Sequence, residues 1–429
     1  MNILYLTHRF PPDHFRGTEV YTFELAHEMQ KLGHRVLAVA LREMPQPGKI
    51  SVVRDSYQDV AVARICKHLN PADFLSYFFD PEMDKIFAEI SADFQPDLVH
   101  ATYFTGGLSL GMTAEAAAQK KLFTTVTDYA ALCPRGQMLD RNYYMCPGPR
   151  RGVRCLFCLF DRLWLFQNPG LDRIARDYFP VSLAGLKKHP QLGWLKKRTH
   201  AIQNVLRESN AVKFSHPLTR YVIDRNRVQV NNPELLDFGV EFAHFQDHNK
   251  SPASRLRIGF IGQVLPHKGL HLLVDALAGI KDQESFELLI YGSLNHPFEK
   301  EYFNSLKLTR VKNQKWLGTF DYSQMNQVLE GIDLLTVPSI WPENCPLTPK
   351  YALLTGTRLL LSDQPGILVK GGGEGIDYFR AGDLATLSEQ IEEILASGKW
   401  AKQFEPRRDL VMSIQDHCSA LLKIYRERA

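Results

Sequence analysis

The stretch from Ser339 to Gly356, SIWPENCPLTPKYALLTG, most strongly limits what this chain can fold into. The apolar run before it, Asp333 to Pro338, predicts a buried parallel strand, and Leu347 to Leu354 predicts a helix that stops at Gly356. Open α/β sheets bind ligands where such a strand ends and such a helix begins, because free backbone N–H groups and the helix dipole converge there. An ordinary strand-to-helix connection is the alternative, and this stretch alone leaves both open.

The size and composition of the chain suit a soluble protein with more than one core. It has 429 residues, of which 45% are hydrophobic and 23% are charged, so two domains are expected. The N-terminal sequence MNILYLTHRFPP lacks the charged region, apolar core and cleavage site of a signal peptide. No apolar run reaches the roughly 20 residues of a membrane span. These features predict a cytoplasmic protein.

Strand-like and helix-like segments alternate in both halves of the chain. Residues 2–7 and 35–41 predict strands on either side of a helix with Thr18 as its N-cap, and a similar series begins at 256–261 after the polar stretch His248–Ser254. This order predicts a doubly wound α/β sheet in each half, and two such domains imply a cleft between them. The predicted division is 1–250 for the first domain, 251–405 for the second, and 406–429 for a terminal helix expected to pack back toward the first.

Two polar residues in the first half follow predicted strands. His100 lies at the end of 97–101, and Asp128 follows 122–126. Residues at the carboxyl ends of parallel strands face the ligand crevice, so both are candidate functional residues. For His100, a hydrogen-bonded core histidine is the alternative.

Four of the seven cysteines fall within 26 residues. In a cytosolic chain, clustered cysteines favour a metal over disulfides, and four thiolates can close a tetrahedral zinc site. Reduced thiols, disulfides and an iron–sulfur cluster remain alternatives. The predicted structural-metal ligands are Cys133, Cys146, Cys155 and Cys158.

Positive charge is concentrated in the segment 141–207. It contains 13 Lys or Arg and three acids, a net charge of +10 in a chain whose total is +4. Interleaved aromatic residues such as Trp164 and Trp194 favour contact with anionic lipid or a pyrophosphate-linked acceptor. A solvated helical face is the alternative. No nucleic acid is expected, because the chain shows no recognised reading module.

Several short motifs together resemble the retaining glycosyltransferases of family 4, which have the GT-B fold of two Rossmann-like domains facing each other across a cleft. The resemblance spans nearly the whole chain and rests on the order of the motifs. The stretch His8–Glu19 is similar to the family's glycine-rich acceptor-side loop, and Thr127–Gln137 with the cysteines behind it looks like a subgroup. The motifs of the second half are FIGQVLPHKG from Phe260, LIYG ending at Gly292, Val337–Ser339, Trp341–Asn344 and Ser362–Asp363.

The resemblance implies a hexosyltransferase-type enzyme that moves a sugar from a nucleotide-sugar donor to an acceptor with retention of configuration. The donor would lie on the second domain and the acceptor on the first. The departing nucleoside diphosphate carries charge that must be stabilised. Since the chain has no D-x-D pair, cations and amides would do this, and no catalytic divalent metal is expected. The implied catalytic residues are Glu343, Lys268, His100 and Asp128, and the implied ligand-binding residues are Gly17, Gln263, Lys268, Gly292, Glu343, Leu347, Thr348 and Tyr351.

The chain departs from the family pattern at several positions. Tyr351 stands where relatives have a second acid that binds the ribose, and Thr127 replaces a histidine that often contacts the sugar. Gln263 and Arg16 replace an arginine and a glycine. The leading hypothesis is an enzyme of cell-surface polysaccharide synthesis that uses a glycan or lipid-linked acceptor and sits in the cytoplasm or at the inner membrane face. A weak or inactive binding or scaffold protein of the same fold is the alternative.

Overall fold

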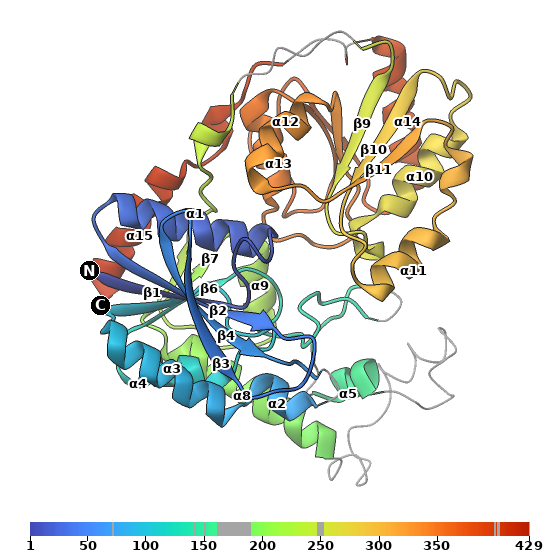
Figure 1. Cartoon of the computed structure of the whole chain (residues 1–429). Helices are drawn as coiled ribbons and strands as arrows, with labels where there is room; N and C mark the ends of the chain where they lie inside the picture. The colour runs from blue at the N-terminus through green and yellow to red at the C-terminus, as the bar shows by residue number, and fades with distance from the viewer. Residues whose placement is uncertain are drawn as a thin grey trace. The chain divides into compact units, whose positions relative to one another are not determined.

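The computed structural model describes residues 1–70, 73–140, 143–149, 152–160, 190–246, 253–398, 400 and 404–428. The chain forms two compact units, Met1–Asp237 together with Cys418–Ala429, and Phe238–His417 (Figure 1). The boundary expected at 250 and 251 lies inside the second of these units. Residues 248–252 of the predicted linker lie outside the described residues.

The first unit is built on an eight-stranded sheet. Neighbouring strands are parallel except for one antiparallel pair at the edge, β3 with β4. The first strand of the chain is central and almost entirely buried, since neighbouring strands flank it on both sides and helices cover both faces of the sheet. In spatial order the strands are β3 (Ser51–Tyr57), β4 (Val60–Lys67), β2 (Arg35–Glu43), β1 (Asn2–Thr7), β5 (Leu98–Ala101), β6 (Leu122–Val126), β7 (Ala211–Phe214) and β8 (Pro233–Leu235).

Helices cover both faces of this sheet. One face carries α3 (Pro81–Phe94), α4 (Leu110–Ala118) and α8 (Pro190–Glu208), and the other carries α1 (Gly17–Lys31) (Figure 1). Local sequence explains where they begin. Asp80 caps α3 by accepting hydrogen bonds from two backbone N–H groups, and Pro81 takes the first helical position. The remaining helices of this unit are α2 (Phe74–Phe78), α5 (Val153–Phe160) and α9 (Pro217–Arg225).

The second unit is built on a six-stranded, fully parallel sheet. Its apolar strands pack against helices on both faces, as Figure 1 shows. In spatial order the strands are β11 (Gln314–Gly318), β10 (Phe286–Tyr291), β9 (Leu256–Ile261), β12 (Leu334–Val337), β13 (Arg358–Ser362) and β14 (Ile376–Phe379). The helices are α10 (Leu270–Gly279), α11 (Pro297–Ser305), α12 (Met325–Glu330), α13 (Leu347–Thr355) and α14 (Leu384–Ser397).

The stretch that opened the sequence argument folds as predicted. β12 ends at Val337, α13 begins at Leu347, and Gly356 caps the helix in the left-handed conformation with φ 67°. A Cβ on Gly356 would stand 2.1 Å from the carbonyl oxygen of Phe404, so a larger residue would clash. The strand-to-helix turn is therefore present in the second unit.

The last helix, α15 (Ile414–Arg428), contributes residues 418–428 to the first unit. Tyr425 is fully buried there, with its hydroxyl 2.6 Å from His100 Nδ1. Of the helices in the described ranges, none has the length and hydrophobicity needed to cross a bilayer.

Candidate functional site

Lys268 and Glu343 form an ion pair in the second unit. Lys268 Nζ lies 2.6 Å from Glu343 Oε1, and Ser339 Oγ donates a hydrogen bond to the same oxygen at 2.9 Å. Glu343 is 4% exposed, whereas the Lys268 side chain is 20% exposed and its Nζ lies 4.9 Å from the centre of the Trp341 ring. Lys268 is therefore a positioned cation that still reaches solvent.

Two loops at the carboxyl ends of neighbouring strands hold this pair. β9 leads into the 3₁₀ turn Pro266–Lys268, and β12 leads to Ser339. The loops are joined by the backbone N–H of Ile340, which donates to the His267 carbonyl at 3.0 Å, and the Ser339 hydroxyl oxygen lies 3.1 Å from the same carbonyl. Gly269 has φ +77°, and a Cβ there would stand 1.7 Å from the carbonyl oxygen of Pro338. Glycine is thus required for Lys268 and Glu343 to meet.

The N-terminus of α13 follows Glu343 directly in the chain. The backbone N–H groups of Leu347 and Thr348 have no acceptor within the helix, because they belong to its first turn. Pro346 at the N-cap supplies no side-chain acceptor. The backbone at Gly366 packs closely against Glu343, since a Cβ on Gly366 would stand 1.7 Å from the Glu343 carbonyl oxygen. Free N–H groups and the helix dipole favour an anion at this end of the sheet.

Gly292 and Gln263 lie at the same edge of the sheet. Gly292 follows β10, and a Cβ there would stand 2.4 Å from the Gly262 carbonyl oxygen. Gln263 is the next residue of the loop after β9. The structure therefore brings these two predicted residues together with Lys268 around the carboxyl ends of β9, β10 and β12.

Tyr351 is placed differently from a ligand-binding acid. It is 3% exposed on α13. Its ring stacks on Phe245, with centroids 5.0 Å apart and an interplanar angle of 15°. The Tyr322 ring lies tilted against it at 5.7 Å. The position where the family resemblance predicts a carboxylate is filled here by an aromatic cluster.

Asp128 is half-buried in the first unit, just after β6. Its carboxylate accepts hydrogen bonds from Ala130 N at 2.7 Å and from the Tyr103 hydroxyl at 2.8 Å. Burial raises the pKa of Asp128 to about 6, although both hydrogen bonds act in the opposite direction. Asp128 lines a small hollow with Tyr103, Thr125 and Thr127. It can therefore change its charge near neutral pH at the carboxyl edge of this sheet.

His8, at the end of β1, also belongs to this edge. Its ring packs on Tyr103 with centroids 4.1 Å apart, and its Nε2 lies 3.4 Å from Glu19 Oε1 on α1. Its Nδ1 is buried and has no hydrogen-bond partner among the described residues. Burial lowers the pKa of His8 well below its usual value, so the ring is neutral. Gly17 is the exposed first residue of α1, two positions before Glu19 in the chain.

His100 occupies the core. It is 1% exposed, and both ring nitrogens are engaged, Nδ1 with the Tyr425 hydroxyl at 2.6 Å and Nε2 with Thr125 Oγ1 at 2.8 Å. Burial lowers its pKa to about 3, with a smaller effect from the Lys213 cation. The core-histidine alternative therefore describes His100, and the geometry offers no free nitrogen for the catalytic role expected from the strand-end rule.

The chain matches known families in both halves. Residues 242–408 match the family of glycosyl transferases group 1, and residues 16–172 match the glycosyl transferase 4-like domain. Each half therefore matches a glycosyltransferase family model, and the two α/β units have the GT-B fold. A glycogen synthase from Hydrogenovibrio crunogenus is 26% identical over 318 residues, which cover 66% of this chain and 60% of that protein. The chain thus spans less than two thirds of that curated relative.

Solved structures share the GT-B fold with this chain. Sucrose-phosphate synthase from Thermosynechococcus elongatus has a TM-score of 0.69 at 15% identity, covering 99% of this chain and 98% of the other. HepE from Anabaena, solved in complex with UDP and glucose, has a TM-score of 0.61 at 16% identity, covering 99% and 97%. At these identities the likeness concerns the fold.

The cysteine cluster does not form a metal site in the described residues. No group of three or more Cys, His, Asp or Glu side chains is placed to hold an ion in that part of the chain. Burial raises the pKa of the Cys146 thiol to about 11 and also raises that of Cys155. All four cysteines of the cluster are free thiols in this structure, which fits the alternative of reduced thiols. The zinc site stays a prediction.

The predicted basic segment lies largely outside the described residues, which omit 161–189. Within α8, Arg198 is 1% exposed, donates to the Ala130 carbonyl and lies 4.8 Å from the centre of the Phe78 ring. Lys197 lies over the Phe79 ring at 4.3 Å. Arg198 therefore packs within the fold and adds no surface charge, whereas Lys197 is exposed.

Three functional candidates were missed by reasoning on the sequence. His8 follows a strand just as His100 does, so the strand-end rule would have found it. Ser339 is the first residue of the stretch Ser339–Gly356, but its hydrogen bond to Glu343 depends on the side-chain rotamers and on the path of the loop, which no sequence pattern specifies. Tyr103 carries no pattern signal, because its hydroxyl meets Asp128 across 25 residues of chain.

Proposed function

We propose that the protein is a retaining hexosyltransferase that uses a nucleotide-sugar donor. The observation that carries the proposal is the Lys268–Glu343 ion pair beside the N-terminus of α13. A nucleotide sugar presents a pyrophosphate next to a polyhydroxylated ring. The site combines a partly exposed cation and the N–H groups of a helix N-terminus, which suit the pyrophosphate, with a buried carboxylate, which suits the sugar hydroxyls.

The proposed roles follow from charge. The bond from the anomeric carbon to the donor phosphate oxygen breaks, and the acceptor hydroxyl oxygen forms a new bond on the same face of the sugar. Negative charge grows on the departing diphosphate, where Lys268 and the N–H groups of Leu347 and Thr348 stabilise it. Glu343 accepts hydrogen bonds from sugar hydroxyls, because its Oε1 is held in place by Ser339 and Lys268. Gln263 and Gly292 line the phosphate side.

The acceptor is proposed to be a glycan or a lipid-linked sugar of cell-surface polysaccharide synthesis, used in the cytoplasm or at the inner face of the membrane. The excess of Lys and Arg in 141–207 supports an anionic partner. Asp128, His8 and Gly17 lie at one edge of the first unit's sheet and are proposed to contact this acceptor. The base of the donor and the identity of its sugar are left open by these contacts.

Substitutions of the ion pair test the proposal. We expect Lys268→Met and Glu343→Gln each to lower the rate of nucleoside diphosphate release from the true donor by about 100-fold or more, as removal of one charge-stabilising group does in other sites. The donor is first found by a thermal-shift screen of nucleotide sugars, since a ligand of the folded state raises the melting temperature. Release is then measured with and without acceptor extracts. Lys315→Met is the matched control, because Lys315 forms an exposed pair with Glu287 on the same sheet.

The outcomes separate the two functions considered. Loss of release in both variants, with Lys315→Met unchanged, supports glycosyl transfer. Unchanged release in Glu343→Gln contradicts the assigned site. Donor binding by calorimetry without any release in the wild-type protein would instead favour a non-catalytic binding protein of this fold.

A further inference from the structure

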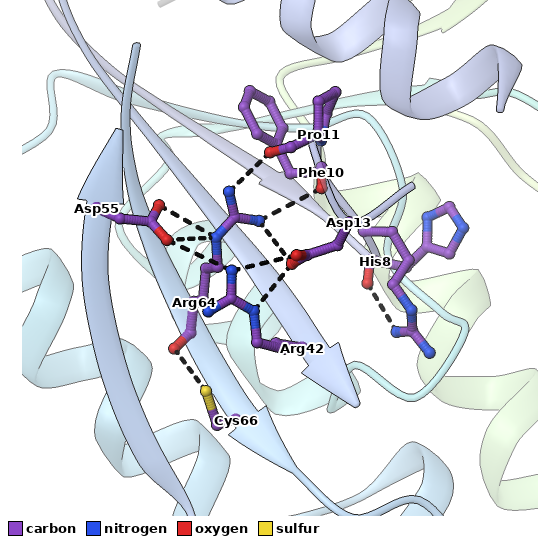
Figure 2. Close-up of polar contacts among 9 residues, drawn as sticks. His8, Phe10, Pro11, Asp13, Arg42, Asp55, Arg64 and Cys66 are labelled. Atoms are coloured by element: carbon purple, nitrogen blue, oxygen red, sulfur yellow. Dashed lines mark hydrogen bonds and ion pairs between the residues drawn. The ribbon is translucent and has the colours of Figure 1, made fainter. Parts of the chain in front are cut away.

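Arg64 on β4 is a fully buried arginine with an unusual set of partners. The side chain is 1% exposed. Its Nε donates to both oxygens of Asp55, at 2.8 and 3.1 Å. Its Nη2 donates to the Pro11 carbonyl at 2.7 Å, and its Nη1 reaches the Phe10 carbonyl at 3.3 Å and Asp13 Oδ2 at 3.0 Å (Figure 2). One guanidinium therefore joins the edge of the sheet to Phe10, Pro11 and Asp13 in the loop after β1.

A second arginine completes the junction. Arg42 on β2 donates to both carboxylate oxygens of Asp13, at 2.9 and 3.2 Å, and to Asp55 at 3.4 Å (Figure 2). Two cations thus face two carboxylates, which balances the charge around the buried Arg64. The side chains of Asp13, Arg42 and Asp55 are 29–33% exposed. Both carboxylate oxygens of Asp13 accept hydrogen bonds from these arginines, which holds the loop in place. Asp13 is therefore an anchor of the loop and is not a group offered to a ligand.

The anchored loop carries the residues assigned to the acceptor edge. It begins at His8, which packs on Tyr103, and it ends at Gly17, where α1 begins. Phe10 and Asp13, both held by Arg64, lie between these two ends. A movement of this middle part shifts both ends, because a chain of so few residues has little slack.

We propose that Arg64 is a positioning residue for acceptor use, which acts by locking the loop His8–Gly17 against the sheet. The proposal rests on the proposed glycosyl transfer. The planar guanidinium is needed because five N–H donors in a fixed fork reach two carboxylates and two carbonyls at once. A lysine at position 64 would offer one compact ammonium and could keep the Asp55 contact while releasing the loop.

The experiment uses Arg64→Lys and Asp13→Asn in the full-length protein. Asp13 has a side chain 29% exposed, so Asp13→Asn loosens the loop while Arg64 keeps Asp55 as its partner and the core stays intact. Arg54→Met is the matched control, since Arg54 lies on the adjacent strand β3 and forms an exposed pair with Asp93. Two quantities are measured: steady-state kinetics with varied acceptor and varied donor, and amide hydrogen exchange of residues 8–17.

We expect both loop variants to lower kcat/KM for the acceptor by about tenfold to 100-fold, the scale reported for small misplacements of reacting groups. The dissociation constant of the donor should change less than about twofold, and amides of 8–17 should exchange faster while those of β5 and β6 do not. Wild-type acceptor kinetics in both variants would overturn the proposal, and so would an equal loss of donor affinity. Absence of transfer in the wild-type protein would refute the proposed function, whereas the exchange result would still decide whether Arg64 locks the loop.

Discussion

Replacing Tyr351 with the acid found in relatives should weaken this protein. The Tyr351 ring is 3% exposed and lies 5.0 Å from Phe245 and 5.7 Å from Tyr322. Each aromatic pair contributes about 0.5–1.5 kcal/mol beyond its buried area, and a carboxyl left without its hydrogen bonds in this cluster costs about 1–3 kcal/mol. Tyr351→Glu is therefore expected to lower the free energy of unfolding of the second unit by about 2–6 kcal/mol.

The assay is urea unfolding followed by tryptophan fluorescence, because Trp316 and Trp341 both lie in the second unit. Tyr351→Phe is the control, since it keeps both ring contacts and removes the hydroxyl, with an expected loss of about 1 kcal/mol at most. Donor affinity, measured by calorimetry well below the unfolding midpoint, should not rise in Tyr351→Glu. A stable Tyr351→Glu variant that binds its donor more tightly would refute the reasoning and place this side chain at the ribose.

Two further predictions concern the edges of the two sheets. Asp128→Asn should remove a pH-dependent part of the stability: the folded state holds the Asp128 proton up to about pH 6, above its usual pKa, so wild-type stability falls as pH rises from about 4 to 6. Thermal unfolding across this range tests it, and an unchanged slope in the variant would show that another group titrates. Gly269→Ala, with φ +77° and a Cβ 1.7 Å from a backbone oxygen, should destabilise the second unit by more than about 2 kcal/mol and weaken donor binding. Gly279→Ala, where a Cβ meets nothing within 4 Å, is its control, and equal behaviour of the two would show that the loops do not need this close approach.

Much of the fold could be predicted from periodicity and turn residues. The buried parallel strands read as apolar runs because helices cover both faces of each sheet. Gly356 and Gly269 stand where the chain needs a left-handed conformation or close approach, and such positions leave a mark in the sequence. Lys268 and Glu343 follow neighbouring strands, so the carboxyl-edge rule brings them together without knowledge of any side-chain rotamer.

The same rule failed for His100, and the reason is physical. The rule predicts that a residue lies at the carboxyl end of a strand, but it does not predict which residues its side chain contacts. His100 meets Tyr425, which lies 325 positions later in the chain, and that contact keeps the ring in the core. The cysteine spacing likewise indicated four candidate ligands, but a metal site requires all donors at one point in space, and spacing does not specify that.

The amino-acid sequence by itself determined two α/β units and the strand-to-helix turn at Ser339–Gly356, because these follow from local periodicity and turn residues. Only the tertiary structure decided that Tyr351 lies in an aromatic cluster, that His100 is a core residue, and that Arg64 holds the loop after β1. Each of these depends on side chains brought together from distant segments, and the free energy of such contacts is set by packing and burial that no local pattern records.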